Sequence, residues 1–244
     1  MKICSALTLT PSTRNPYWNI PMRKPLFSHL LVAFILSVSV FGSWGGAHAQ
    51  TGIDNYNVNG KFVIAARAGN LELAQNLLKE GAVIDSRDRN GDSTLLNATR
   101  KGDVPMVKML ILNHANVNLA NIPKVTPLMA AAYNGNEEIL TMLIDAGADI
   151  HAVDQVDKTA AIYAAANGHL NCLKKLLAVG INVNQAYAHD LTLLMWAAAY
   201  GQNETVSYLL QVGANPKTTD DRGKNAAELA KDGHFTETAK LLNL

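Results

Sequence analysis

The chain has 244 residues, of which 48% are hydrophobic and 17% charged, and its formal net charge is +1. This composition is too apolar for an intrinsically disordered protein, and the near-neutral charge gives no field that would attract nucleic acid or an anionic membrane. Its two cysteines exclude a disulfide framework and a four-thiolate zinc site.

Residues 1–49 have the pattern of a secretory signal peptide. They contain four basic residues and no acidic one, an apolar block at 30–42, and the small-residue exit Ala47-His48-Ala49. The apolar block is shorter than the about 20 residues that span a bilayer. We therefore expect cleavage after Ala49, delivery to the periplasm and no membrane attachment afterwards. An uncleaved anchor is the alternative.

The basic region before the apolar block is unusually long. A start at Met22 leaves a compact signal, MRKPLFSHLLVAF, so we interpret Met22 as the true initiator. Beyond residue 49 the chain has 17 basic and 20 acidic residues, a net charge of −3, and Cys172 is its single cysteine. Because no disulfide can form there, packing must supply the stability. Residues 50–55 are a short leader.

In the remainder, 56–244, one unit repeats every 33 residues, without a gap over the first five units. Glycines recur in register at Gly69, Gly102, Gly135, Gly168 and Gly201. The predicted repeats are 56–88, 89–121, 122–154, 155–187, 188–220 and 221–244. In the sixth, Gly233 comes one residue early, so we expect that repeat to be one residue short.

Each repeat predicts a helix–turn–helix unit. A polar turn leads to an N-cap Ser or Thr, and an alanine-rich helix then ends at the recurring glycine. A second helix follows, with a buried apolar stripe such as Ile139, Leu140, Leu143 and Ile144. Neither helix face can be buried within one unit, so the units must stack into an all-α solenoid. The predicted N-caps are Ser93, Thr126, Thr159 and Thr192.

Residues 126–136, TPLMAAAYNGN, resemble the ankyrin signature T-P-L-H-x-A-A-x-x-G-H, and residues 143–150, LIDAGADI, resemble its ending. The resemblance covers 56–244 and implies a solenoid that binds proteins without catalysis. With the signal peptide, the chain is similar to periplasmic ankyrin proteins of Gram-negative bacteria. Some of that group are associated with protection from peroxide alongside a catalase.

Residues with catalytic or metal-binding chemistry do not form a recognisable motif. No serine lies in G-x-S-x-G, and the histidines lack metalloprotease spacing. Cys172 aligns with the apolar stripe, so we predict a buried, inert thiol. His169 and His234 follow helix-ending positions, where the family resemblance implies local hydrogen bonds. The sequence predicts no enzyme, no metal, no cofactor and no nucleic-acid partner.

The resemblance also implies a binding face along the first-helix row and the loop tips. Units one and two place basic residues there, and units three to five place aromatic and apolar ones. We expect protein contacts through Tyr133, Tyr163, Trp196, Tyr200, Val156, His189, Leu191, Arg100 and Lys101. The other predicted loop-tip residues are Ile122, Pro123, Val125 and Tyr187. Tyr163 and Trp196 have the alternative role of filling space between repeats.

The predicted function is a non-catalytic protein–protein interaction module in the periplasm, acting as a monomer on an unidentified protein. One alternative is an accessory factor that protects or assists a periplasmic enzyme in oxidative-stress defence. A second alternative is a small-ligand or haem binder that uses His189 with Tyr187 and Tyr200. Catalysis is disfavoured because no acid–base pair or nucleophile stands out from the repeat.

Overall fold

The computed structural model describes residues 57–243, and the predicted signal peptide, the Met22 start and the 50–55 leader lie outside the described residues. Within 57–243 there are twelve α-helices, one short 3₁₀ turn and no strand. The elements are α1 (Val58–Ala68), α2 (Leu71–Lys79), α3 (Thr94–Lys101), α4 (Val104–Leu112), α5 (Pro127–Asn134), α6 (Glu137–Asp145), α7 (Ala160–Ala166), α8 (Leu170–Ala178), η1 (Ala188–Asp190), α9 (Leu193–Ala199), α10 (Asn203–Gln211), α11 (Ala226–Asp232) and α12 (Thr236–Leu242).

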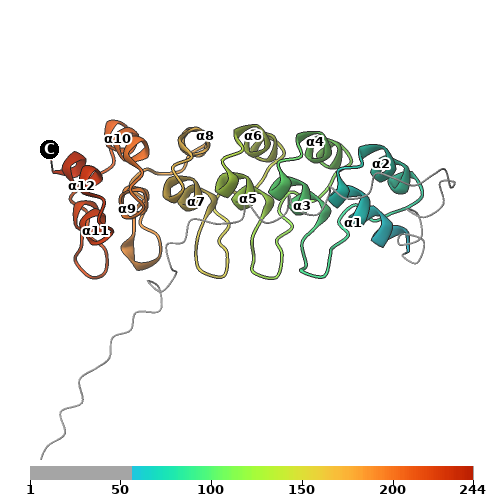
Figure 1. Cartoon of the computed structure of the whole chain (residues 1–244), viewed down its shortest axis with the longest axis horizontal. Coiled ribbons are helices and arrows are strands. Elements are labelled where there is room, and N and C mark those ends of the chain that lie inside the picture. The colour runs from blue at the N-terminus through green and yellow to red at the C-terminus, as the bar shows by residue number, and fades with distance from the viewer. Residues whose placement is uncertain (1–56, 244) are drawn as a thin grey trace, which may run out of the picture. The chain divides into compact units, whose positions relative to one another are not determined.

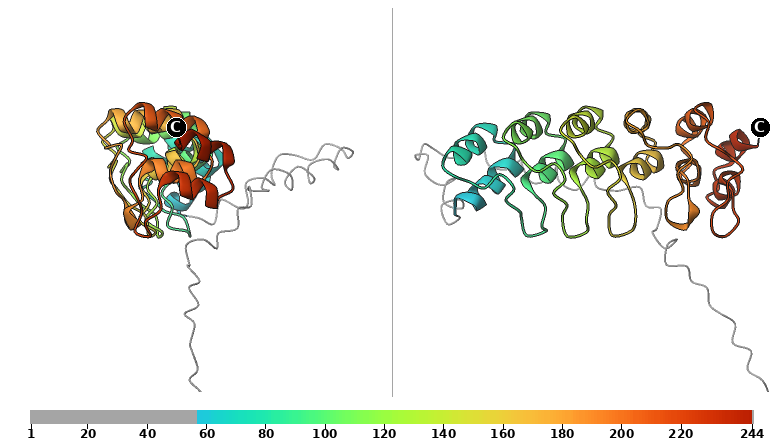
Figure 2. Two further views of the ribbon diagram at one scale, coloured as in Figure 1. Left: turned by 90° about the vertical axis from the view of Figure 1, so that its left-hand side faces the viewer. Right: turned by 180° about the vertical axis from the view of Figure 1, so that it is seen from behind.

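The helices form two parallel rows. The odd-numbered helices stand side by side in one row, each packed against its neighbours in the adjacent repeats, and the even-numbered helices form the other row, in which α8 and α10 are less closely packed than the other pairs. The loops that lead into α3, α5, α7, α9 and α11 extend together on one side (Figure 1), and the same two rows are visible from the end and from behind in Figure 2. This arrangement confirms the predicted all-α solenoid.

The predicted N-caps begin the first helices of repeats two to five. The side chain of each accepts a hydrogen bond from the backbone N–H three residues later, as in the 3.1 Å bond from Leu96 N to Ser93 Oγ. Such a cap contributes about 1 kcal/mol to helix stability. The four confirmed caps are Ser93, Thr126, Thr159 and Thr192.

The sixth repeat keeps the 33-residue register, so the predicted one-residue shortening is wrong. His234, which is 33 residues after Gly201, has the left-handed backbone (φ 61°), whereas Gly233 has φ −79°. Leu242, 33 residues after Leu209, is buried in the same way. The prediction followed glycine identity, but here a histidine adopts the conformation that glycine usually takes.

The core is continuous along the array. The alanines of the first helices are almost fully buried, which lets neighbouring helices approach closely, and the leucine stripe of the second helices covers them. Cys172 is 1% exposed, which confirms the predicted buried thiol. Burial, with a smaller contribution from the Glu137 charge, raises the pKa of Cys172 to about 11.

Side chains from one repeat cap the first helix of the preceding repeat. Asn134 Nδ2 donates to the carbonyl of Arg100 at 2.9 Å, and Gln202 Nε2 donates to that of Ala166 at 2.9 Å. His169 Nε2 contacts the carbonyl of Tyr133 at 2.9 Å. The hydrogen bond of His169 is therefore made between repeats rather than locally. These contacts satisfy carbonyls that a helix end leaves without partners.

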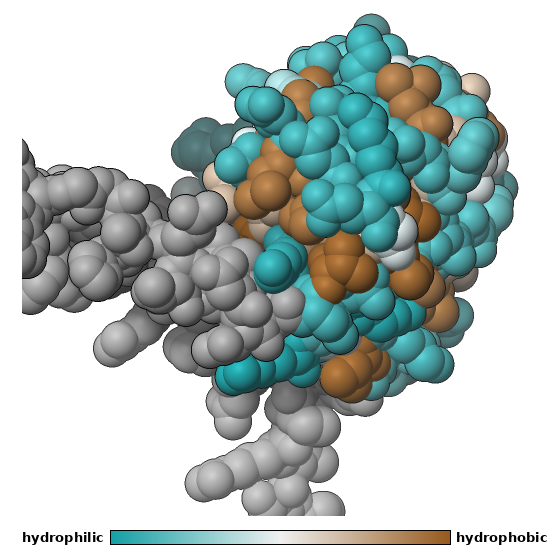
Figure 3. Space-filling model, turned by 90° about the vertical axis from the view of Figure 1, so that its right-hand side faces the viewer, coloured by the Kyte–Doolittle hydropathy of each residue, from teal (hydrophilic) through white to brown (hydrophobic). Residues whose placement is uncertain are grey.

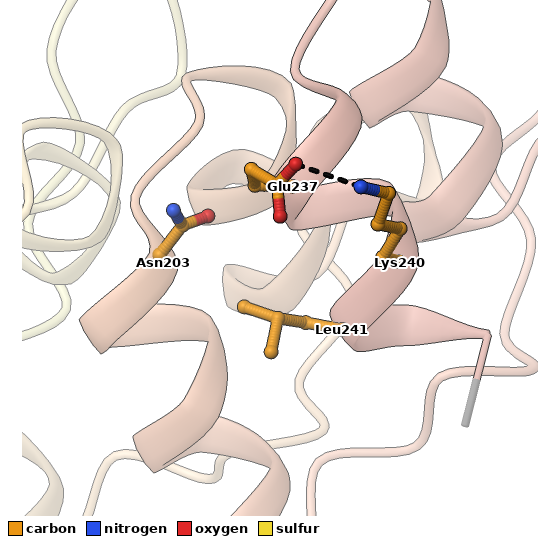
Figure 4. A pocket seen from close by; sticks show the side chains of 4 residues that line it. All are labelled: Asn203, Glu237, Lys240 and Leu241. Carbon is orange, nitrogen blue, oxygen red and sulfur yellow. Dashed lines mark hydrogen bonds and ion pairs between the residues drawn. The ribbon is translucent and has the colours of Figure 1, made fainter.

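The two ends of the array differ from its interior. Around α1 and α2 the surface is mainly hydrophilic with separate hydrophobic patches (Figure 3), as a capping repeat requires. At the other end, α10 and α12 border an open hollow lined by Asn203, Glu237, Lys240 and Leu241 (Figure 4). Within residues 57–243, no helix has the length and apolarity needed to cross a membrane.

Candidate protein-binding surface

Four aromatic side chains form two ring pairs on consecutive first helices. Tyr133 on α5 meets Tyr163 on α7 edge to face, with ring centroids 5.7 Å apart and an interplanar angle of 81°. Trp196 on α9 stacks on Tyr200, the C-cap residue of that helix, with ring centroids 6.2 Å apart. We call these four residues the aromatic strip. Tyr133 and Tyr200 are 54% and 39% exposed, while Tyr163 and Trp196 are half-buried and pack against the core.

Lys158, in the loop before α7, joins the two ring pairs. Its Nζ lies 4.9 Å from the centroid of the Trp196 ring and 5.8 Å from that of the Tyr163 ring. Both separations are within the range of a cation–π interaction. Burial lowers the pKa of Lys158, and the nearby charge of Asp154 opposes this shift. The strip is thus one surface with a cation at its centre.

Asp154 organises the loop and orients Tyr163. Its Oδ2 accepts a hydrogen bond from the Tyr163 hydroxyl at 2.5 Å, and its Oδ1 accepts from the backbone N–H groups of Val156 and Lys158. Burial, reinforced by the hydrogen bond to Asp154, raises the pKa of Tyr163. Tyr163 therefore fills space between repeats as one member of the aromatic strip, and its contact with a partner protein stays a prediction.

The loop tips beside the strip expose apolar side chains. Ile122 is 68% exposed and Val156 is 58% exposed. Gln155 joins the two tips, because its side chain donates to the carbonyl of Ile122 at 2.8 Å and its backbone N–H donates to that of Pro123 at 3.1 Å. This places two exposed aliphatic groups on neighbouring, hydrogen-bonded loops.

Leu191 departs from the prediction of an exposed loop tip. It is only partly exposed and packs against the core, as Tyr187 and Val125 also do. The reason lies in the hairpin, where Tyr187 N–H donates to the carbonyl of Leu191 at 2.9 Å and pins this side of the loop against the helices. Leu191 is therefore a packing residue of the fifth repeat.

The fifth hairpin differs because Tyr187 occupies the position that holds Asp or Asn in the other hairpins. Those residues are Asp88, Asn121, Asp154 and Asp220, and each accepts hydrogen bonds from loop N–H groups. Without such an acceptor the loop forms η1, and His189 and Asp190 adopt left-handed φ values of 60° and 56°.

His189 contacts Asp221 in the neighbouring hairpin through both its side chain and its backbone. Its Nδ1 lies 2.7 Å from Asp221 Oδ2, and its carbonyl accepts from the Asp221 N–H at 3.1 Å. The hydroxyl oxygen of Tyr187 is buried, and Tyr200 stacks on Trp196. His189 and Tyr200 therefore contact different neighbours, and the haem-binding alternative stays a prediction.

The basic residues of repeat two hold the fold together as well as facing solvent. Arg100 Nη1 pairs with Asp92 Oδ2 at 3.0 Å, and Asp92, which is almost fully buried, also accepts a 2.7 Å hydrogen bond from Asn121. Lys101 donates to the carbonyl of Arg67. Arg100 keeps nearly half of its side chain exposed, so it remains available beside the strip.

Sequence reasoning missed Lys158. It occupies the same place in the repeat as Val125 and Leu191, directly before the N-cap, and both of those were predicted as loop-tip residues. The same place holds the charged residues Asp92 and Lys224 in repeats two and six, so the repeat register did not single out Lys158. Its place between two aromatic rings depends on side-chain orientation, which the repeat register does not specify.

Comparison with known proteins agrees with this architecture. The sequence model of a family described as Ankyrin repeats (3 copies) matches residues 62–154 and 149–220. A search of curated proteins found no match. The family matches span more than half of the chain, and the stacked helix pairs have the expected 33-residue repeat. The chain therefore belongs to the ankyrin-repeat family.

Proposed function

We propose that this chain is a non-catalytic module that binds a partner protein through the aromatic strip and the adjacent tips, Ile122 and Val156. Ankyrin repeats generally mediate protein–protein interactions. The observation that carries the proposal is the continuity of the strip over three repeats, with Tyr133 and Tyr200 exposed on a rigid scaffold. Tyrosine and tryptophan supply much of the binding energy at protein interfaces.

The polar groups around the strip support binding rather than catalysis. Both oxygens of Asp154 accept hydrogen bonds from the chain itself, and His189 pairs with Asp221. A general base must have a lone pair available to the substrate, and both oxygens of Asp154 already accept hydrogen bonds from Tyr163 and from its own loop. The acidic and imidazole groups near the strip serve as structural contacts that hold the loops and rings in place.

We further propose that the protein acts in the periplasm. The support is the sequence of residues 1–49, with its basic start, apolar block and Ala47-His48-Ala49 exit. N-terminal sequencing of the protein released by osmotic shock is expected to begin at Gln50. Recovery of the intact N-terminus in the membrane fraction would instead indicate a retained anchor.

A photo-crosslink tests the binding surface. A photoreactive amino acid replaces Tyr200 in the full chain, and adducts formed in cells are identified by mass spectrometry. We expect one dominant protein adduct, which is lost when Tyr133→Ala is added. The control probe replaces Tyr208 on α10, in the other helix row. Equal adducts from both positions, or an adduct unaffected by Tyr133→Ala, would contradict the proposal.

A further inference from the structure

Lys158 is a half-buried cation without an anionic partner. Among residues 57–243, no hydrogen-bond acceptor lies within bonding distance of its Nζ, and no carboxylate lies within ion-pair distance. Its contacts are the ring faces of Tyr163 and Trp196. A buried ammonium group is costly unless it is paired and hydrogen-bonded. The aromatic faces offset part of this cost, and the N–H donors of the ammonium group have no acceptor among residues 57–243.

The nearest acidic residue cannot serve as that partner in the observed arrangement. Asp154 Oδ2 is held by the Tyr163 hydroxyl, and Asp154 Oδ1 is held by two backbone N–H groups of its own loop. Rotation of Asp154 toward Lys158 would break the bonds that shape the hairpin. Asp154 therefore acts on Lys158 through its charge alone.

The surroundings of Lys158 are apolar with further positive charge on one side. The rings of the aromatic strip lie around it, and Val156 is exposed two residues away. Arg100 is exposed on α3, two repeats before Lys158, while the exposed acidic residue Asp157 directly precedes Lys158 in the same loop. A ligand on this surface would contact the Lys158 ammonium group together with the aromatic rings beside it.

We infer that the partner presents an acidic side chain flanked by apolar ones, with its carboxylate bound to Lys158 and the apolar groups on Tyr133 and Tyr200. This inference rests on the proposed function and specifies the chemistry of the partner segment. Hydrogen bonds between charged groups are stronger where water is excluded, so the carboxylate gains more at Lys158 than at an exposed lysine. Lys158 is then the residue that determines specificity.

Selection from a displayed library of random peptides tests this chemistry. The full chain is immobilised, and enriched peptides are sequenced. We expect Asp or Glu next to large apolar residues, and we expect Tyr133→Ala with Tyr200→Ala to abolish capture. The most enriched peptide is then synthesised together with its analogue, in which Gln or Asn replaces the acidic residue.

A double-mutant cycle between peptide and protein isolates the contact. On the wild-type chain the amide analogue is expected to bind about tenfold more weakly than the acidic peptide. Lys158→Met keeps the aliphatic stem of the side chain. This variant is expected to bind the acidic peptide about tenfold more weakly than the wild-type chain does, and to bind the two peptides equally. Lys158→Arg should retain the preference. The matched control is Lys174→Met, because Lys174 Nζ lies 5.1 Å from the Tyr208 ring in the other helix row.

The outcomes separate this inference from the proposed function. Equal binding of the two peptides by the wild-type chain, or failure to enrich any acidic peptide, overturns the role of Lys158. If Tyr133→Ala with Tyr200→Ala still abolishes capture, the strip remains the binding surface. If all variants capture peptides equally, the strip itself is wrong. Circular dichroism shows whether Lys158→Met is folded. If it is not, the comparison of the two peptides on the wild-type chain alone tests the role of Lys158.

Discussion

The hydroxyl of Tyr163 donates a 2.5 Å hydrogen bond to the carboxylate of Asp154, which is 4% exposed and lies nine residues earlier in the chain. The bond ties a loop to the first helix of the same repeat and orients the ring that meets both Tyr133 and Lys158. An equivalent bond joins Asn97 to Asp88 in repeat two at 3.2 Å. The same contact therefore shapes the hairpin and orients a ring of the proposed binding surface.

Tyr163→Phe tests this contact. The substitution removes the hydrogen bond and leaves one oxygen of a buried carboxylate unsatisfied, so the free energy of unfolding should fall by about 1–3 kcal/mol. Urea denaturation measures the change. Tyr208→Phe is the control, because no hydrogen bond of its hydroxyl exists among the described residues, and it should change stability little. Equal effects of the two variants would contradict the role of Asp154.

Two glycines with similar backbone conformations should respond differently to alanine. Gly135 (φ 73°) and Gly147 (φ 85°) are both left-handed, so alanine is strained by about 1 kcal/mol at each. A Cβ at Gly135 would also lie 2.4 Å from His169 Nδ1, whereas at Gly147 it would meet nothing within 4 Å. Gly135→Ala should therefore lower the free energy of unfolding by about 1 kcal/mol more than Gly147→Ala does, because the hydrogen bond between His169 and the Tyr133 carbonyl is lost. Thermal or urea unfolding of the pair measures the difference.

The stability of the sixth hairpin should depend on acid pH through Asp220. Burial acts to raise the pKa of Asp220, but the N–H groups of Lys224 and Arg222 and the ion pair with Arg222 outweigh it and lower the pKa below 3.8. A lowered folded-state pKa gives stability that is present above the unfolded value and is lost as pH falls through the folded value. We expect the unfolding free energy to fall below about pH 4, and less steeply in Asp220→Asn. Parallel curves for the two proteins would refute this assignment.

Cys172 should react with thiol reagents only after unfolding. Its side chain is 1% exposed, and burial raises the thiol pKa to about 11. Because the folded pKa lies above the unfolded value of 9.0, the thiol contributes stability that is present below that value and is lost as pH rises between the two. Labelling of a Cys4→Ser chain at neutral pH should be slow and should accelerate with urea. Rapid labelling without denaturant would show that the thiol is accessible.

Most of the fold followed from the repeat. The N-caps Ser93, Thr126, Thr159 and Thr192, the buried Cys172 and the two-helix unit were all predictable, because each depends on hydrogen bonds or apolar spacing within a few residues of the chain. The prediction for the sixth repeat was wrong because it assumed that a glycine always occupies the left-handed position after the first helix. His234 adopted a conformation expected of glycine, and the register of the sixth repeat was therefore misread.

The candidate surface was predictable only in part. The repeat register correctly placed Tyr133, Tyr200, Ile122 and Val156 at exposed positions. It also placed Leu191 there, although that side chain folds onto the core, and it did not draw attention to Lys158. Register determines which positions face the same side, but it does not determine how far a side chain turns inward.

By itself the sequence determined the two-helix unit, the N-caps of repeats two to five and the residues of the buried stripe, because these depend on periodicity and on hydrogen bonds local to the backbone. The tertiary structure alone decided that Lys158 lies between Tyr163 and Trp196, that Asp154 is fully engaged and that His189 pairs with Asp221. These contacts depend on the side-chain conformations and stacking of adjacent repeats, which no spacing along the chain encodes.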